Sequence, residues 1–383
     1  MQLYQQRESI HFEVANPTSD QVIATVTRGP SKARFAINRA IMTFVQQFET
    51  PCTTDEAIRR YCKQERIQLT DARQRDLRAF ARQIAATLLL NPIHTNAETA
   101  EQSIAPLGFE HRRTFKDKRF DAVCLVNTPD GLQVIKNIKE QVVTQSARRD
   151  ILRDLENEFR VLTRLDGVSG VVAARTFCAT SPAYFAMDYV CGDRLDKYVR
   201  SQPLCLLQRL DMAMQLLRLF AEIHDAGVLH GDVHLGNFMC SPTRQITVID
   251  FGCASMQDSD YRPSGGATPH FAPPERASES WTRVCHSQPT RASECYQLGI
   301  VIAYVMTGTL PFRGKTYREL HRAIMSAEYR LPTTTPDGQP IPPALHNLIG
   351  DMLQRNPDDR PSDLMRLAHQ FQSYANQESA HVI

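Results

Sequence analysis

Alternating apolar and polar positions predict strands near the start of the chain. The runs Ser9 to Val14 and Gln21 to Val26 alternate or cluster as strands do, with the turn residues Asn16-Pro17 between them. The period then changes, because apolar residues from Ile37 to Val45 recur at three- and four-residue steps, which predicts a helix. Strands therefore come first, and a helix follows them.

Two further patterns complete this segment. Thr53-Thr54-Asp55-Glu56 predicts the N-cap and first turn of another helix, and a third apolar face runs from Leu77 to Leu88. Residues 92–108 are polar and irregular, with a proline near each end, and predict a linker. We therefore expect a separate small domain over residues 1–91.

Strand and helix patterns resume after the linker. Strands are predicted from Asp121 to Val126 and from Leu132 to Lys136, and an amphipathic helix from Glu156 to Leu165. From Leu206 to about Ala226 the apolar positions follow the period of a core helix. The apolar run from Tyr296 to Phe312 predicts a second buried helix that is too short to span a membrane.

Composition narrows the class of protein. A chain of 383 residues with 42% hydrophobic residues can form about two to three domains. The net charge of +2 argues against a chain-wide affinity for nucleic acid or membranes. The ten cysteines include no C-x-x-C pair, so neither a disulfide framework nor a zinc site is indicated. No secretory signal or long apolar run is present, and we expect a soluble, cytoplasmic protein.

Two polar stretches carry the candidate chemistry. The first is His230-Gly231-Asp232-Val233-His234-Leu235-Gly236-Asn237, and Asp250-Phe251-Gly252 follows it. Two acids and an amide at this spacing suit phosphoryl transfer, which needs Mg²⁺ on the phosphates and a carboxylate that orients the attacking hydroxyl. Asp232 would take the hydroxyl proton, and Asn237 and Asp250 would hold the metal ion. His230 and His234 could instead suggest zinc ligands, but this motif explains them better.

These two stretches resemble the H-R-D-x-x-x-x-N and D-F-G signatures of the protein-kinase family, and the likeness extends over residues 109–375. The resemblance implies an α+β, bilobal fold. It places a strand-rich N-lobe at 109–190, a helical C-lobe at 191–375 and a tail at 376–383. It also implies ATP and Mg²⁺ as cofactors.

The same resemblance implies a nucleotide pocket. Lys136 matches the strand lysine that contacts the α- and β-phosphates, and Glu158 matches the helical glutamate that pairs with it. The stretch from Tyr184 to Gly192 looks like the hinge between the lobes, where backbone groups bind the adenine edge. The residues that the resemblance places around the adenine are Val123, Val134, Met187, Asp188, Val190 and Met239.

A further landmark closes the activation segment. Ala267 to Glu275 resembles the stretch that ends in A-P-E, with Pro273 in place of its alanine. The resemblance pairs Glu275 with Arg360. It also gives Glu294, where the family usually has Asp, the role of anchoring the catalytic loop.

The phosphate-binding loop departs from the family. Where a glycine-rich loop is expected, the stretch from Phe115 to Asp121 contains no glycine, and glycines let backbone amides approach phosphates closely. We hypothesise that the charged side chain of Lys116, Lys118 or Arg119 takes the place of those amides.

The catalytic loop departs from the family at two positions. Gly231 replaces the arginine that reads a phosphorylated activation loop, so activity should not depend strongly on that modification. His234, which we include among the catalytic residues, replaces the lysine that marks serine/threonine kinases. H-G-D-x-H-x-x-N also looks like the catalytic loops of aminoglycoside- and choline-type kinases and of the kinase domains of lanthipeptide synthetases.

Three functions therefore stay open. We favour a kinase that phosphorylates Ser or Thr of a protein or of a ribosomal precursor peptide. Small-molecule kinases generally lack the A-P-E-like segment and seldom show D-F-G. The alternatives are such a small-molecule kinase and a pseudokinase that acts as a binding scaffold, which the missing glycines suggest.

The N-terminal domain has a likeness of its own. Its outline resembles a winged-helix module, and Phe35 to Ala40 with Thr53 to Ile58 looks like a precursor-peptide recognition element, which would dock a leader peptide on an edge strand. Twelve Lys and Arg against six Asp and Glu between Arg28 and Arg82 leave nucleic-acid binding as a less favoured alternative. A structural or regulatory role stays open as well, since such charges usually form a solvated helix face.

Overall fold

The structure of this chain is a computed structural model that divides into two units, Met1–Ala97 and Glu98–Ile383. Each unit buries apolar clusters of its own. The residues that the structure describes are 3–6, 10–14, 21–28, 31–48, 52–70, 74, 77–78, 90–93, 99–118, 120–140, 143, 145–261, 268–277, 288–314 and 316–381.

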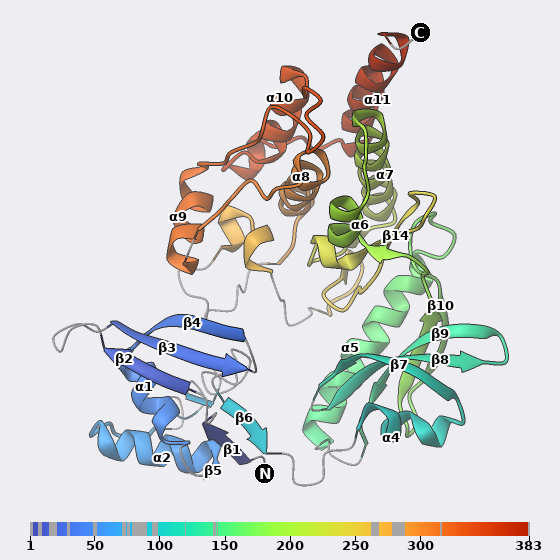
Figure 1. The fold of residues 1–383 in the computed structure, drawn as a ribbon. Helices are drawn as coiled ribbons and strands as arrows, with labels where there is room; N and C mark the ends of the chain where they lie inside the picture. Colours follow the sequence, from blue (N-terminus) through green and yellow to red (C-terminus); the bar gives the residue numbers. More distant parts are fainter. Residues whose placement is uncertain are drawn as a thin grey trace. The chain divides into compact units, whose positions relative to one another are not determined.

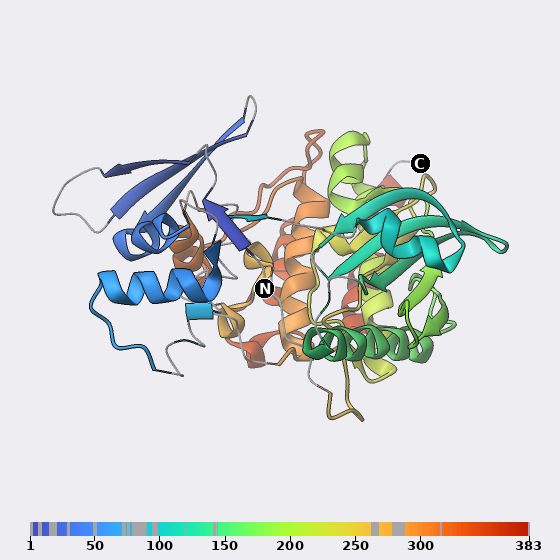
Figure 2. The same cartoon turned by 90° about the horizontal axis from the view of Figure 1, so that it is seen from below.

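The first unit is built on an antiparallel sheet with two helices on one side of it (Figure 1, Figure 2). The strands of this sheet are β2 (Ile10–Val14), β3 (Gln21–Arg28) and β4 (Ser31–Asn38). The helices are α1 (Arg39–Gln46) and α2 (Thr54–Gln64). A second small sheet contains β1 (Leu3–Gln6), β5 (Cys52–Thr53) and β6 (Leu90–Ile93).

Both predicted strands and the predicted N-cap of the first unit are confirmed. The Thr53 hydroxyl accepts the Glu56 N–H at 3.2 Å, and the Glu56 carboxylate accepts the Thr53 N–H at 2.7 Å. The helix predicted from Ile37 begins only at Arg39, because the backbone stays extended through β4, a strand that the spacing did not predict. The predicted turn at Asn16-Pro17 and most of the face from Leu77 to Leu88 lie outside the described residues.

The second unit contains a five-stranded antiparallel sheet of strand order β10-β11-β9-β8-β7 (Figure 1). The predicted strands at 121–126 and 132–136 are confirmed as parts of β8 and β9. The strand bounds are β7 (Glu110–Asp117), β8 (Asp121–Thr128), β9 (Gly131–Ile138), β10 (Ala174–Cys178) and β11 (Tyr184–Asp188).

One face of this sheet is covered by helix α4 (Ala100–Ile104) and the 3-10 helix η1 (Ala105–Leu107). The α4 side chains Ala100 and Ile104 are buried against β8 and β9. Thr99 is the N-cap of this helix, and its hydroxyl accepts the backbone N–H of Gln102. The polar stretch that predicts a linker therefore contains a folded cover for the sheet.

The opposite face of the sheet packs on helix α5 (Gln145–Arg164). Phe159 of α5 stacks on Phe177 of β10, with ring centroids 5.4 Å apart. The helix begins well before its predicted start at Glu156, because Ile151 and Leu152 continue the same apolar face. This arrangement brings one side of α5 to the side of the sheet that carries Lys136.

The helical lobe is organised around α8 (Arg291–Thr307), in which every residue from Ser293 onward is buried. This helix contacts α7 (Leu206–Asp225) and α10 (Pro343–Met352), and α11 (Leu364–His381) packs along α7. Both core helices predicted from the apolar spacing are thus confirmed. Further elements are α6 (Leu195–Ser201), α9 (Tyr317–Ser326), η2 (Leu235–Asn237), η3 (Pro269–Phe271), η4 (Pro274–Arg276) and η5 (Pro357–Asp359).

Short strand pairs hold the two polar stretches that carry the candidate chemistry. β14 pairs with β12 and β15, and β13 pairs with β16. Their bounds are β12 (Asp193–Arg194), β13 (Val228–Leu229), β14 (Phe238–Cys240), β15 (Ile246–Val248) and β16 (Ser255–Met256). None of the helices in the described part of the chain has the length and apolar character that a membrane crossing requires.

Candidate active site

A buried ion cluster joins the sheet, helix α5 and the D-F-G stretch. Lys136 on β9 donates to Glu158 of α5 in a short contact and to Asp250 Oδ1 at 2.8 Å. Burial disfavours the Lys136 ammonium, but the two carboxylates outweigh that effect and raise the pKa of Lys136. Lys136 in turn holds the pKa of Asp250 well below its usual range. The lysine and Asp250 therefore stay charged.

Strand pairing places the predicted pocket residues on the face that carries Lys136. Val123 is directly opposite Lys136, and Met187 is directly opposite Val134. Opposite residues of an antiparallel pair point to the same face, as do residues two apart on one strand. The other three predicted pocket residues are Asp188 at the end of β11, Val190 just after it, and half-buried Met239 on β14. Contacts of these six residues with adenine stay a prediction.

The D-F-G stretch lies beside the catalytic loop. The Ile249 N–H donates to the Asn237 carbonyl at 2.8 Å, so Asn237 and Asp250 stand at adjoining ends of β14 and β15. Asp250 has φ +66°, a left-handed conformation that is uncommon outside glycine. Phe251 is fully buried against His230, with ring centroids 4.8 Å apart. A left-handed conformation like that of Asp250 persists only where the surrounding structure fixes the chain, and the buried Phe251 ring supplies such a fixed point.

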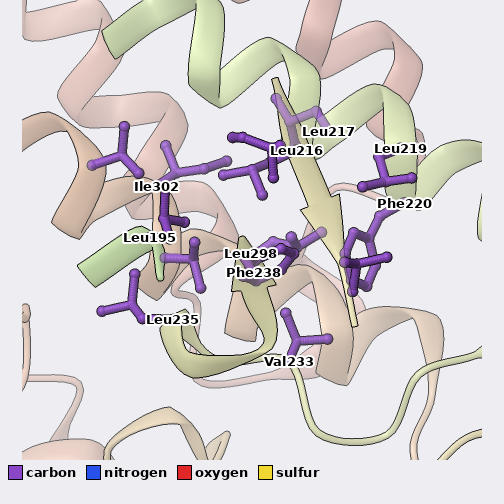
Figure 3. Close-up of a cluster of buried hydrophobic side chains, with 14 of the residues drawn as sticks. Leu195, Leu216, Leu217, Leu219, Phe220, Val233, Leu235, Phe238, Leu298 and Ile302 are labelled. Carbon is purple, nitrogen blue, oxygen red and sulfur yellow. The ribbon is translucent and has the colours of Figure 1, made fainter. Parts of the chain in front are cut away.

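Apolar residues alternate with polar ones along the catalytic loop and anchor it. Val233, Leu235 and Phe238 are buried, and Figure 3 shows them in one cluster with side chains of α6, α7 and α8. The intervening side chains of Asp232 and His234 keep 20% and 21% of their surface exposed. The buried apolar side chains thus fix the loop, while the side chains of Asp232 and His234 stay accessible.

Two residues surround the Asp232 carboxylate. His234 Nε2 lies 3.5 Å from Oδ2, and the Thr268 N–H and hydroxyl lie 3.3 and 3.4 Å from Oδ1. The Gly236 N–H donates to His234 Nδ1 at 3.0 Å, so the proton of a neutral ring sits on Nε2 and faces Asp232. Thr268 was not expected at this site from the sequence. The sequence feature that could have identified Thr268 is its position just before Pro269 in the A-P-E-like segment.

Gly231 has a backbone conformation that other residues rarely adopt. Its φ is +81°, and a Cβ there would lie 2.2 Å from the carbonyl oxygen of Cys253. Its N–H donates to Glu294 Oε1 at 2.7 Å, and its carbonyl accepts from Arg276 at 3.1 Å. Glu294 also lies 2.8 Å from His224 Nε2. The anchoring role predicted for Glu294 is confirmed despite its extra methylene.

The predicted pair between Glu275 and Arg360 is confirmed. Two guanidinium nitrogens of Arg360 each donate to a different Glu275 oxygen at 2.8 Å. The Arg360 side chain is fully buried, and its guanidinium carbon lies 4.8 Å from the centre of the Tyr296 ring. This bidentate pair fixes the A-P-E-like segment to the helical lobe.

Two contacts tie α5 to the segment that follows D-F-G. Asn157 donates to the Ala254 carbonyl at 3.0 Å, and the Tyr261 hydroxyl donates to Asp154 in a short contact. Glu158 lies on the same helix, so these contacts also help to position the partner of Lys136. Neither contact requires a phosphate group on the segment.

The hairpin between β7 and β8 occupies the place of the missing glycine-rich loop. Lys116 Nζ lies 2.7 Å from Asp250 Oδ2, so one of the three hypothesised cations is in the site. Lys118 pairs instead with Asp121 at 3.3 Å. Arg119 lies outside the described residues.

The donors beside the catalytic loop suit Mg²⁺, which takes oxygen ligands from one or two protein side chains and from substrate phosphates. Asn237 Nδ2 donates to the Asp232 carbonyl at 2.9 Å, so its amide oxygen is the atom that would bind the ion. Asp250 offers a carboxylate next to it. Across the described residues, no group of three or more His, Cys, Asp and Glu side chains could hold an ion.

Comparison with known proteins agrees with this geometry. The family described as Protein kinase domain matches residues 123–372. The chain is 30% identical over 246 residues to the serine/threonine-protein kinase pkn3 of Myxococcus xanthus, covering 61% of this chain and 43% of that protein. It is 29% identical over 242 residues to the serine/threonine-protein kinase PkaA of Streptomyces coelicolor, covering 61% and 41%. The chain thus spans less than half the length of these two relatives.

The family match takes in most of the second unit, including the ion cluster, the catalytic loop and the Glu275–Arg360 pair. The five-stranded sheet with α5 forms the strand-rich lobe that the resemblance implied, and the helices around α8 form the helical lobe. The α+β, bilobal fold is therefore confirmed. The chain therefore belongs to the protein kinase domain family.

Proposed function

We propose that this chain is a serine/threonine protein kinase that transfers the γ-phosphoryl group of Mg-ATP to a hydroxyl of a polypeptide. Asp232 accepts the hydroxyl proton while the new oxygen–phosphorus bond forms and the bond from the γ-phosphorus to the bridging oxygen breaks. Lys136 binds the α- and β-phosphates, and Glu158 keeps its amine in position. When bound, Mg²⁺ held by Asn237 and Asp250 neutralises charge on the phosphates.

The observation that carries this proposal is the assembly of both halves of the site. Lys136 already contacts Glu158 and Asp250, and Asp232 stands on an anchored loop beside Asn237. A protein that served only as a scaffold would not need a carboxylate held for proton transfer as well as a paired lysine. The geometry therefore favours an enzyme over a pseudokinase.

Two contacts favour a polypeptide acceptor over a small molecule. The Glu275–Arg360 pair holds the A-P-E-like segment in place, and Thr268 from the start of that segment contacts the Asp232 carboxylate. A segment fixed beside the base supplies a platform for an extended chain. The names of the bacterial relatives, both serine/threonine-protein kinases, point in the same direction.

For the first unit we propose that it is a winged-helix-like module that docks the polypeptide substrate, with the leader of a ribosomal precursor peptide as the ligand class. Among the described strands, β2 and β4 each pair with β3 alone within their sheet. Edge strands can accept a further strand through main-chain hydrogen bonds, which is how β-augmentation binds peptides. The docked peptide would then raise the local concentration of its Ser and Thr residues.

Asp232→Ala should lower kcat by about 10²–10⁴-fold, because it removes the base, and should leave Mg-ADP affinity nearly unchanged. Asp250→Ala should weaken Mg-ADP binding as well, because it removes a metal ligand and a partner of Lys136. Phosphoryl transfer is followed with labelled ATP, and binding is measured by calorimetry. Asp211→Ala, on the exposed side of α7, is the control. Normal turnover by Asp232→Ala would refute the assignment of the base.

The acceptor class is tested by incubating the whole chain with labelled ATP and Mg²⁺ in separate reactions. The acceptors are a generic basic protein, Ser- and Thr-containing peptides, and a set of aminoglycosides and choline. We expect label on Ser or Thr of polypeptides. Label confined to the small molecules would favour a metabolite kinase, and bound nucleotide without any transfer would favour a scaffold.

The docking proposal is tested by removing residues 1–97, since each unit has its own core. We expect kcat/KM for a short acceptor peptide to stay within about twofold, and kcat/KM for a full-length polypeptide substrate to fall by about tenfold or more, because docking acts through effective concentration. Equal changes for the two substrates would contradict a docking role.

Activity should be independent of phosphorylation in the activation segment. Phosphatase-treated protein should keep its kcat within about twofold, because Gly231 has no side chain to bind a phosphate. Loss of activity after phosphatase treatment would contradict this prediction.

Gly231→Ala should lower both activity and thermal stability, since its Cβ would meet the Cys253 carbonyl oxygen at 2.2 Å. Gly167→Ala is the matched control, because Gly167 has a similar φ of +85° and nothing within 4 Å of its Cβ position.

A further inference from the structure

Lys116 brings a second ammonium group to the carboxylate of Asp250. Its Nζ lies 2.7 Å from Oδ2, while Lys136 Nζ lies 2.8 Å from Oδ1, so each oxygen of Asp250 contacts one lysine. Burial raises the pKa of Glu158, whereas Lys136 and Lys116 hold the pKa of Asp250 well below its usual range. Lys116 is therefore the second cation that contacts Asp250.

A β-bulge aims Lys116 into the site. Along the β7–β8 pair, Thr114 is opposite Cys124 and Lys116 is opposite Val123, so Phe115 is an extra residue in the strand. Without this bulge, Lys116 would be opposite Ala122, which faces the α4 side of the sheet. The bulge therefore moves the lysine to the opposite face, where Val123 and Lys136 are directly paired.

The extra residue of the bulge has a partner of its own. The Phe115 ring stacks on Tyr189, just after β11, with centroids 6.5 Å apart and an angle of 13° between the ring planes. The guanidinium carbon of Arg113 lies 5.3 Å from the centre of the same ring. These contacts stabilise the bulged register and with it the direction of the Lys116 side chain.

A metal ion on Asp250 would lie close to the Lys116 ammonium group, which is 2.7 Å from Oδ2, and two cations at that distance repel each other. Lys136 is buried and also contacts Glu158, whereas the Lys116 side chain is 52% exposed. Lys116 is therefore the amine that would leave when Mg²⁺ enters. Its long, flexible stem would keep the ammonium close to the phosphates that accompany the ion.

We propose that Lys116, which contacts Asp250 in this structure, is a second phosphate-binding lysine for the phosphates of a bound nucleoside di- or triphosphate. This inference rests on the proposed nucleotide site. It assigns to one side chain the role that backbone amides of a glycine-rich loop would otherwise have. It also makes Lys116 a competitor of Mg²⁺ for Asp250.

The test measures binding by calorimetry on the whole chain, with ADP in EDTA, ADP with Mg²⁺, and adenosine. Lys116→Met should bind ADP in EDTA about tenfold or more weakly than the unchanged protein, the fold-change that corresponds to one charge-assisted hydrogen bond. Adenosine affinity should not change, because adenosine has no phosphate. The gain in ADP affinity on adding Mg²⁺ should be larger in Lys116→Met, since Asp250 no longer has a competing amine.

Lys118→Met is the matched control, because it removes the same charge from the same hairpin at a residue that pairs with Asp121. Lys116→Arg should retain binding of ADP in EDTA, and circular dichroism checks that each variant is folded. Unchanged ADP affinity of Lys116→Met in EDTA, or equal losses in the Lys116 and Lys118 variants, would overturn the proposal. Normal nucleotide binding without transfer to any acceptor would instead contradict the proposed kinase function and leave the role of Lys116 intact.

Discussion

The active site depends on keeping the Lys136 amine charged although it is buried. Burial disfavours the charged form, so the fold has to supply carboxylate partners for it. A buried charge without a partner costs several kcal/mol, so Glu158 and Asp250 have to remain beside it. These three residues come from the sheet, from α5 and from the segment after β15. Their attraction therefore couples the two lobes in one arrangement of the site.

The catalytic loop is kept in place by apolar anchors and by contacts to its backbone. Buried Val233, Leu235 and Phe238 hold the catalytic loop, while Glu294 and Arg276 bind the main chain of Gly231. Backbone in a left-handed conformation, as at Asp250 and Gly231, is stable only within such a frame. These contacts hold the catalytic loop through groups of the chain itself.

Much of the site could be predicted from sequence, because Lys136, Glu158, Asp232, Asn237 and Asp250 lie in motifs whose order is readable along one chain. Other features depend on which element a segment packs against in the folded chain. A bulge is defined by the strand opposite it, so the choice of Lys116 over Lys118 could not be made from β7 alone. Likewise, α4 has few apolar residues, so its sequence pattern predicts a linker. Its role as a cover is visible only from its packing against the sheet.

The cover that α4 gives the sheet also determines where the catalytic unit can be cut. The kinase-like motifs begin only later, and the family match starts at residue 123. A fragment that began at either place would expose the apolar side chains of Cys124, Val126 and Ile135 to water. Exposed patches of this kind promote association between molecules. A short segment ahead of Phe109, which lies outside the family match, therefore keeps this apolar face of the sheet away from water.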